Sequence, residues 1–282
     1  MNWPWRDWAD EKWLTVLGYQ SGHGDDANTV KWIHSGPVVE FAKKADPTRP
    51  VVRTEVSVRP IINLEPPYEN HSGYQSRQPH SAYSVRRAVY YSLLSTPVAG
   101  VTYGGHGVWS WHTKPGEHPT DHQGTGPAKH WKEALALPGA AHMGHVRKLF
   151  ESVPWTQLEP APELVIQGVK DDPTKFVACA TTPGHKVMVL YYPAGAKAAL
   201  APAVPLAGTT VTWFDPRTGD SKTGGGLTPP NADDWVLVIR QGRAGGGRPG
   251  AGLPPVGGEQ SSVDTRPPGG PPDAARTPVH AR

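Results

Sequence analysis

Two glutamates lie on either side of a rigid corner in the segment RPIINLEPPYENH, residues 59–71. Glu65 follows an apolar run that is typical of a buried strand, and Pro66–Pro67 then ends regular structure. Proline on its C-terminal side fixes the backbone and therefore the direction of Glu65. With Tyr68 beside it, such a carboxylate suits carbohydrate chemistry, because it can attack an anomeric carbon or stabilise an oxocarbenium ion. The second carboxylate, Glu69, follows four residues later.

Other polar and aromatic residues also fall directly after expected strands. Such residues converge on one edge when parallel strands form a barrel whose active site lies at their carboxyl ends. Two tryptophans, two residues apart, are expected on one face of a strand, where both could line a sugar subsite. The candidate substrate-binding residues are Gln20, His23, Tyr68, Glu69, Tyr103, His106, Trp109 and Trp111, with Glu65 as the catalytic candidate.

Each candidate also has a purely structural interpretation. A strand-end glutamate can pair with a nearby arginine, here Arg53 or Arg59. Paired tryptophans pack in a core more often than they bind sugar, and a loop histidine is usually satisfied by backbone groups. The segment HTKPGEHPTDH, residues 112–122, spaces two histidines four apart, but its Pro and Gly content disfavours a helix and HExxH is absent, so no metal site is predicted.

The first 160 residues alternate strands, loops and helices. Residues 13–19 and 59–65 are typical of buried strands, with one further strand possible in residues 49–56. Residues 30–45 have helical spacing interrupted by Pro37, and residues 81–95 form the clearest helix, which Ser81 can cap. A strand is expected within residues 98–111, followed by one or two helices over 130–155. This order predicts a parallel α/β sheet or barrel for residues 1–160.

The pattern changes near Pro160. Short β-type runs separated by Gly and Pro clusters predict a small antiparallel β-sandwich over residues 161–240. Cys179 lies in the alternating run FVACATT and is expected to be a buried small apolar residue, not a nucleophile. The segment DPRTGD, residues 215–220, suits a tight hairpin turn. In residues 241–282, Gly and Pro fill 18 of 42 positions with no aromatic residue, which predicts a disordered tail.

Composition argues against several classes of partner. The formal charge is +3, and five arginines against three acidic residues in the tail leave about +1 for residues 1–240, so no clustered basic face for nucleic acid is evident. No stretch approaches the apolar length of a membrane span. Composition therefore predicts no nucleic acid and no membrane partner, and we predict no cofactor. The carboxylate and aromatic residues described above leave carbohydrate as the predicted partner. The N-terminus shows no export signal.

Four ordered segments, WLTVLGYQSGH, INLEPPYE, SVRRAVYYSLLSTPVAGVTYGGHGVW and HWKEALALPGAAHMGHVRKLFES, resemble the later part of the apiosidase-like glycoside hydrolase family. The segment TWFDPRTGD is similar to the small domain that follows, labelled collagen-binding, and the resemblance runs from about Trp8 to Arg240. It implies a (β/α)₈ barrel that cleaves plant polysaccharide. The EPxYE pattern of the family assigns the nucleophile role to Glu65 and a supporting or binding role to Tyr68 and Glu69.

The chain departs from that family in two respects. Only about 160 residues precede the sandwich where a barrel needs about 250, and the segment resembling WILGGD that carries the acid/base in the family is absent. The expectation is therefore a partial (β/α)₈ barrel with later strands only, in a truncated glycoside hydrolase-like protein that can self-associate through exposed sheet edges. The alternative is a non-catalytic protein that binds polysaccharide or collagen. The resemblance implies export, so the localisation stays open.

Overall fold

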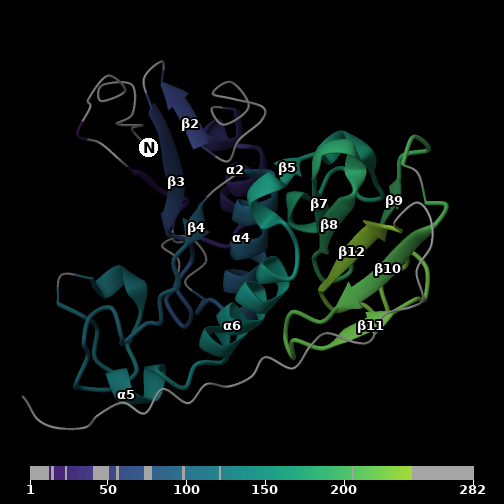
Figure 1. Cartoon of the computed structure of the whole chain (residues 1–282). Coiled ribbons are helices and arrows are strands. Elements are labelled where there is room, and N and C mark those ends of the chain that lie inside the picture. The colour runs from purple at the N-terminus through teal and green to yellow at the C-terminus, as the bar shows by residue number, and fades with distance from the viewer. Residues whose placement is uncertain are drawn as a thin grey trace, which may run out of the picture. The chain divides into compact units, whose positions relative to one another are not determined.

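The computed structural model describes residues 13, 16–22, 24–40, 51–54, 57–72, 78–96, 99–120, 122–204 and 206–242. The described residues up to Gly242 belong to one compact unit. Residues 243–282 of the predicted tail lie outside the described residues, and Gln241, placed in the tail from the sequence, ends a strand. In the first half, the helices and strands alternate along the chain (Figure 1). They are β1 (Leu17–Gln20), α2 (Ala27–Ser35), β2 (Val51–Thr54), β3 (Ser57–Glu65), α4 (Ala82–Ser95), β4 (Gly100–Val101), α5 (Trp131–Ala134) and α6 (Pro138–Glu151).

Strands β1, β3 and β4 run parallel, with β3 between the other two. The connection from β1 to β3 contains α2 and the connection from β3 to β4 contains α4, which is the βαβ arrangement expected from the sequence. Strand β2 instead pairs antiparallel with the first half of β3, as in a hairpin. The further strand expected within residues 49–56 therefore exists as β2, but it is not one of the parallel strands.

Side-chain caps set where the two long helices of this half begin. Asp26 accepts hydrogen bonds from the backbone N–H groups of Asn28 and Thr29, at 2.9 and 3.2 Å, so α2 starts earlier than the predicted residue 30. Gly36 ends this helix, and a helical stretch resumes at Pro37. The helical pattern over residues 30–45 is therefore divided at Gly36, and residues 41–45 lie outside the described part of the chain. In α4, Ser81 accepts from the N–H of Ser84, as expected.

The strand expected within residues 98–111, running into a loop, is shorter than predicted and does not reach the two tryptophans. Only Gly100–Val101 is a strand, and residues 106–111 form consecutive turns. Gly107 adopts a φ of 111°, and a Cβ there would lie 2.4 Å from the carbonyl oxygen of Lys129. A loop that needs a positive φ and such a close approach cannot continue an extended strand. The two tryptophans that follow therefore do not share a strand face.

The second half forms a six-stranded antiparallel sheet in the order β11-β10-β12-β8-β7-β5, as predicted in outline, together with a two-stranded sheet of β6 and β9. The strands are β5 (Glu159–Pro160), β6 (Val165–Gln167), β7 (Ala178–Thr181), β8 (Val187–Tyr192), β9 (Ala198–Leu200), β10 (Thr209–Phe214), β11 (Ser221–Thr223) and β12 (Trp235–Gln241). Short 3₁₀ helices lie at Gln123–Thr125, Trp155–Gln157, Pro162–Leu164, Pro173–Lys175 and Pro183–His185.

Alternating side chains of the large sheet divide between two cores. On one face, residues such as Ala180, Val189 and Val238 pack with the helices, while on the other Cys179 and Leu190 pack with the small sheet. Cys179 is buried as predicted, and burial raises the pKa of its thiol to about 12, so it is protonated at neutral pH and a poor nucleophile.

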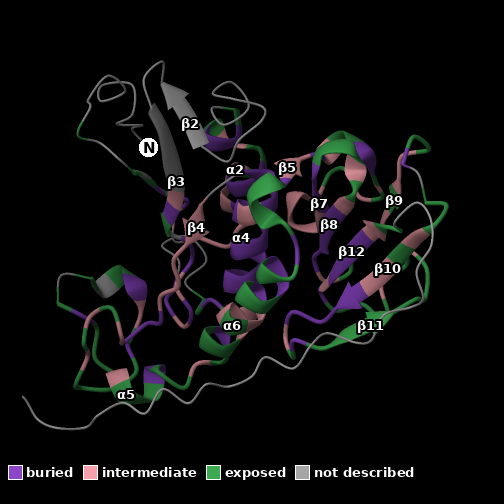
Figure 2. Cartoon of the chain, viewed as in Figure 1, coloured by how far each residue is buried: buried purple, intermediate pink, exposed green. Residues whose placement is uncertain are grey.

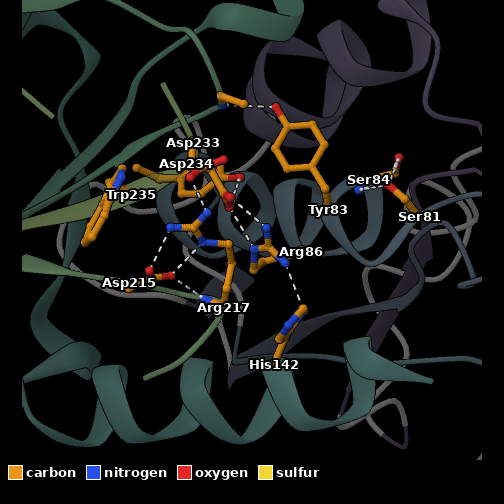
Figure 3. Close-up of polar contacts among 12 residues, drawn as sticks. Ser81, Tyr83, Ser84, Arg86, His142, Asp215, Arg217, Asp233, Asp234 and Trp235 are labelled. Atoms are coloured by element: carbon orange, nitrogen blue, oxygen red, sulfur yellow. Dashed lines mark hydrogen bonds and ion pairs between the residues drawn. The ribbon is translucent and has the colours of Figure 1, made fainter. Parts of the chain in front are cut away.

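The core between the helices and the large sheet crosses the predicted domain boundary near residue 160. Tyr90 of α4 stacks on Tyr191 of β8 with ring centroids 4.7 Å apart, and Phe150 of α6 joins the same cluster. Figure 2 shows this buried band along α4 and the facing strands. A buried ion pair, Arg86 with Asp234, lies in the same interface (Figure 3). The helices and the sheet therefore stabilise each other directly.

The described residues contain neither a membrane-spanning helix nor a cluster of metal-binding side chains. None of the helices found there is long and apolar enough to span a membrane. Within the same residues, no group of three or more His, Cys, Asp or Glu side chains is arranged to hold a metal ion.

Candidate active site

The carboxyl ends of the parallel strands bring together two of the residues predicted from the sequence. Gln20, the last residue of β1, is the register partner of Glu65, the last residue of β3, after an irregularity between Tyr19 and Gln20. On the other side of β3, Thr102 donates a backbone hydrogen bond to the carbonyl of Asn63 at 3.0 Å. Glu65 therefore ends the central strand of the parallel set, which is the position where barrel enzymes carry catalytic residues.

The corner after Glu65 is held against the segment that follows β4. The N–H of Glu69 donates to the carbonyl of Gly104, and the N–H of His106 donates to the carbonyl of Glu69, both at 2.8 Å. A Cβ at Gly104 would lie 2.3 Å from the Tyr68 ring, so the ring packs directly on the glycine backbone. The two loops therefore continue the parallel pairing beyond the strands and hold Tyr68, Glu69 and Tyr103 together.

The Glu69 carboxylate is buried and accepts two hydrogen bonds at one of its oxygens. It is 3% exposed, and its Oε2 accepts a hydrogen bond from the Tyr103 hydroxyl at 2.7 Å and from the backbone N–H of Gly139 at 2.8 Å. Gly139 lies in the first turn of α6, where Leu137 offers no capping side chain, so Glu69 caps the helix from a distant loop. Burial and the adjacent carboxylate both raise the pKa of Tyr103, which keeps its hydroxyl a donor.

Gly139→Ala is expected to disrupt this arrangement. A Cβ at residue 139 would lie 2.2 Å from Oε2 of Glu69 and 3.0 Å from the Tyr103 ring, so the helix or the loop must move. We expect the free energy of unfolding to fall by about 1–3 kcal/mol. Gly144→Ala is the matched control in the same helix, because a Cβ there meets no atom within 4 Å. It should raise the stability by roughly 0.5–1 kcal/mol. Denaturant unfolding of both variants checks the pair, and equal effects would contradict the packing argument.

His106 is also engaged at both ring nitrogens. Its Nδ1 accepts a hydrogen bond from the indole N–H of Trp109 at 3.1 Å, so its Nε2 carries the proton and donates to the carbonyl of Gly126 at 2.9 Å. The residue is fully buried, and burial lowers the pKa of its imidazole, which favours this neutral form. These contacts leave neither nitrogen for a sugar hydroxyl. They orient Trp109, whose ring remains 37% exposed.

Trp111 lies apart from this cluster and contacts a residue that sequence reasoning did not select. Its ring stacks on that of Trp131 with centroids 4.2 Å apart and an interplanar angle of 14°. The Trp111 backbone has a φ of 48°, in the left-handed region that bulky residues avoid. Such a conformation costs about 1–3 kcal/mol and persists only where the surrounding structure imposes it.

A further polar cluster was missed from the sequence. Asp25, in the loop after β1, lies 3.5 Å from Nδ1 of His80 and accepts a hydrogen bond from the Ser84 hydroxyl at 2.7 Å. The hydrogen bond from His80, with that from Ser84, lowers the pKa of Asp25 to about 2, so the carboxylate is ionised at neutral pH. Two adjacent aspartates, Asp25 and Asp26, could have indicated a polar site, but His80, which contacts Asp25, lies 55 positions further along the chain.

The predicted site residues therefore separate into groups. Gln20 and Glu65 lie at the strand ends, and the loops join Tyr68, Glu69, Tyr103, His106 and Trp109 into one cluster. Trp111 stands with Trp131 in a separate pair. His23 lies outside the described residues.

Solved structures with a similar fold are glycoside hydrolases. One, described as a glycoside hydrolase, superposes with a TM-score of 0.64 at 18% identity, over 83% of this chain and 54% of the other. A second, a glycoside hydrolase family 5 protein from Bacteroides vulgatus ATCC 8482, gives 0.62 at 17% identity, over 82% and 52%. At these identities the likeness concerns the fold, and the chain spans about half the length of these structures. No curated protein matches the chain.

The fold of this chain is thus similar to part of the fold of these glycoside hydrolases. Residues 2–157, more than half of the chain, match the family described as apiosidase-like, catalytic domain, and the chain belongs to that family. The match covers β1, β3, β4 and helices α2 to α6, and so includes all the candidate residues considered above.

Proposed function

We propose that the chain acts on plant-type polysaccharide as a glycoside hydrolase with Glu65 as its nucleophile. The observation that carries the proposal is the position of Glu65, which ends the central parallel strand opposite Gln20 and leads into a corner braced through Glu69. Membership of the apiosidase-like family supports a carbohydrate ligand. In this proposal Gln20, Tyr68, Trp109 and Trp111 contact substrate, whereas Glu69, Tyr103 and His106 position the loops.

In the reaction, a carboxylate oxygen of Glu65 bonds to the anomeric carbon while the bond from that carbon to the leaving oxygen breaks. The leaving oxygen either departs as a stable anion, as a dinitrophenolate does, or takes a proton from an acid, as a sugar hydroxyl must. Water then hydrolyses the glycosyl ester and restores the carboxylate. In retaining enzymes a second carboxyl group, about 5–5.5 Å away, protonates the leaving oxygen. Two described carboxylates near these loops are unsuited to this role. Glu69 is capped by Tyr103 and Gly139, and Asp25, with its pKa of about 2, has no proton to donate at neutral pH.

The test measures attack by Glu65 on the anomeric carbon with a substrate whose leaving group needs no proton. A dinitrophenolate leaves without being protonated, so Glu65 alone suffices for dinitrophenyl glycosides, whereas a polysaccharide needs an acid. We expect the chain to release dinitrophenolate from at least one member of a panel covering the common plant cell-wall sugars. Peptide mass mapping after a rapid quench should find the glycosyl group on Glu65. If a folded chain releases dinitrophenolate from no glycoside of the panel, the proposed activity is refuted.

A second candidate function is supported by the exposed tryptophans. Trp109 and Trp111 are 37% and 62% exposed, respectively, in loops fixed by backbone hydrogen bonds, which suits binding of polysaccharide without cleavage. Pull-downs against plant polysaccharides and collagen distinguish this candidate. Retention on one of these supports without any turnover of the dinitrophenyl panel would favour the binding protein over the hydrolase.

A further inference from the structure

A stacked pair of tryptophans lies on the surface of the region that follows β4. Trp111 comes from the turns after this strand and Trp131 begins α5. One face of the Trp111 ring lies against Trp131, and the residue as a whole is still 62% exposed, so the other face of the ring is open. Within the described part of the chain, no further ring or cation contact to Trp111 is found. We call Trp111 and Trp131 together the tryptophan platform.

Backbone contacts hold the platform in place before any ligand arrives. The N–H of Trp131 donates to the carbonyl of His112 at 2.8 Å, and that of Trp111 donates to the carbonyl of Val108 at 2.9 Å. The N–H of His112 in turn bonds to the carbonyl of Gly107, whose close approach to Lys129 joins the two segments. The same fold imposes the positive φ of Trp111. The ring is therefore held in one position by its backbone, with no ligand needed to order it.

The surroundings of the platform favour a polar ligand with an apolar face. The Lys132 ammonium lies 5.5 Å from the centroid of the Trp131 ring, and His130 lies beside the same ring with centroids 6.0 Å apart. These neighbours provide hydrogen-bond donors around a flat aromatic surface. A sugar ring matches this combination, since its C–H face stacks on an indole while its hydroxyls reach the polar rim.

We propose that the tryptophan platform is a carbohydrate-binding subsite that takes one ring of a plant polysaccharide, at a distance from Glu65. Helix α5, which carries Trp131, lies well separated from the ends of β1, β3 and β4 (Figure 1). The subsite would hold a chain while another part of it reaches the strand ends. The proposal rests on the carbohydrate specificity of the proposed function, but it does not depend on cleavage.

The test is retardation of the full chain in native gels that contain soluble pectin, xyloglucan, arabinoxylan or galactomannan. All proteins carry Glu65→Gln, so the gel polymer is not cut. We expect Trp111→Ala to weaken the retarding affinity by roughly tenfold and Trp111→Tyr to restore part of it. Trp155→Ala is the control, because Trp155 is as exposed as Trp109 but lies in a 3₁₀ helix before β5. It should migrate like the parent.

A second measurement avoids substitution altogether. N-bromosuccinimide oxidises exposed indoles, and the polysaccharide that retards the chain should protect Trp111 but not Trp155, as read by peptide mass mapping. No retardation by any of the four polymers, or equal retardation of Trp111→Ala and its parent, would overturn the subsite. If the chain hydrolyses no dinitrophenyl glycoside but is still retarded by a polysaccharide, the hydrolase proposal is wrong and the subsite proposal is retained.

Discussion

Glu65→Gln should reduce the release of dinitrophenolate by on the order of 10³-fold or more, with the fold intact. The amide has nearly the shape of the carboxylate but lacks the charge and the nucleophilic oxygen that attack the anomeric carbon. Residual turnover would come from binding and orientation alone. Initial rates on the most reactive glycoside of the panel, with far-ultraviolet circular dichroism and thermal melts as folding controls, measure the effect.

Chemical rescue makes this prediction specific for a nucleophile. In Glu65→Ala, azide can enter the vacated space and attack the anomeric carbon directly, so the product should be a glycosyl azide and the rate should rise with azide concentration. The comparison variant is Glu69→Ala. The native Glu69 carboxylate accepts hydrogen bonds from Tyr103 and Gly139. Removing it should therefore lower the melting temperature, and azide should not restore the rate. If azide rescues Glu69→Ala but not Glu65→Ala, the two roles are reversed.

The parts of this site that the sequence predicts are those set by local rules. Ser81 caps α4 as expected, because a hydroxyl before an apolar row at helical spacing contacts its own helix. Glu65 and Gln20 meet at the strand ends because each ends a strand and the two strands pair in parallel. The strand predicted through Trp109 and Trp111 fails because Gly107 requires a positive φ and lies against Lys129, a contact that no short window contains.

The contacts that escape prediction join distant segments. Asp25 meets His80, Trp111 meets Trp131, and Glu69 caps a helix that begins 69 residues later. The sequence shows each of these residues, but which residue it contacts depends on the tertiary fold. The partner of Arg86 was also not predicted. Arg86 lies in the middle of α4, on a face that is buried against residues from the second half of the chain. Charge in an apolar face was the only available signal.

Asp234→Ala is expected to lower the free energy of unfolding by about 3–5 kcal/mol. Asp234 accepts from Nε and Nη2 of Arg86 at 2.7 and 2.6 Å, and from the Tyr191 hydroxyl at 3.0 Å (Figure 3). Arg86 and Asp234 are only 3% and 2% exposed at their side chains. Removing the carboxylate therefore leaves a guanidinium charge buried between α4 and β12 without its counter-ion.

His142 cannot replace the lost carboxylate. Its Nδ1 accepts a hydrogen bond from Nη1 of Arg86 at 2.8 Å, which requires a neutral ring, and burial together with the Arg86 charge lowers its pKa to about 4. Denaturant unfolding measures the loss, and Arg147→Ala is the control, because its pair with Glu151 is exposed and its removal should leave the midpoint unchanged.

A double-mutant cycle with Arg86→Met and Asp234→Leu shows whether the cost comes from the unpaired charge. Met and Leu together remove both charges and can fill the space between the helix and the sheet, so the double variant should be more stable than either single variant. Additive losses would mean that the pair does not act as a unit. A double variant that unfolds at the wild-type midpoint would show that the ion pair orients α4 and the sheet without adding net stability, in which case the shared apolar core around Tyr90 and Tyr191 alone holds them together.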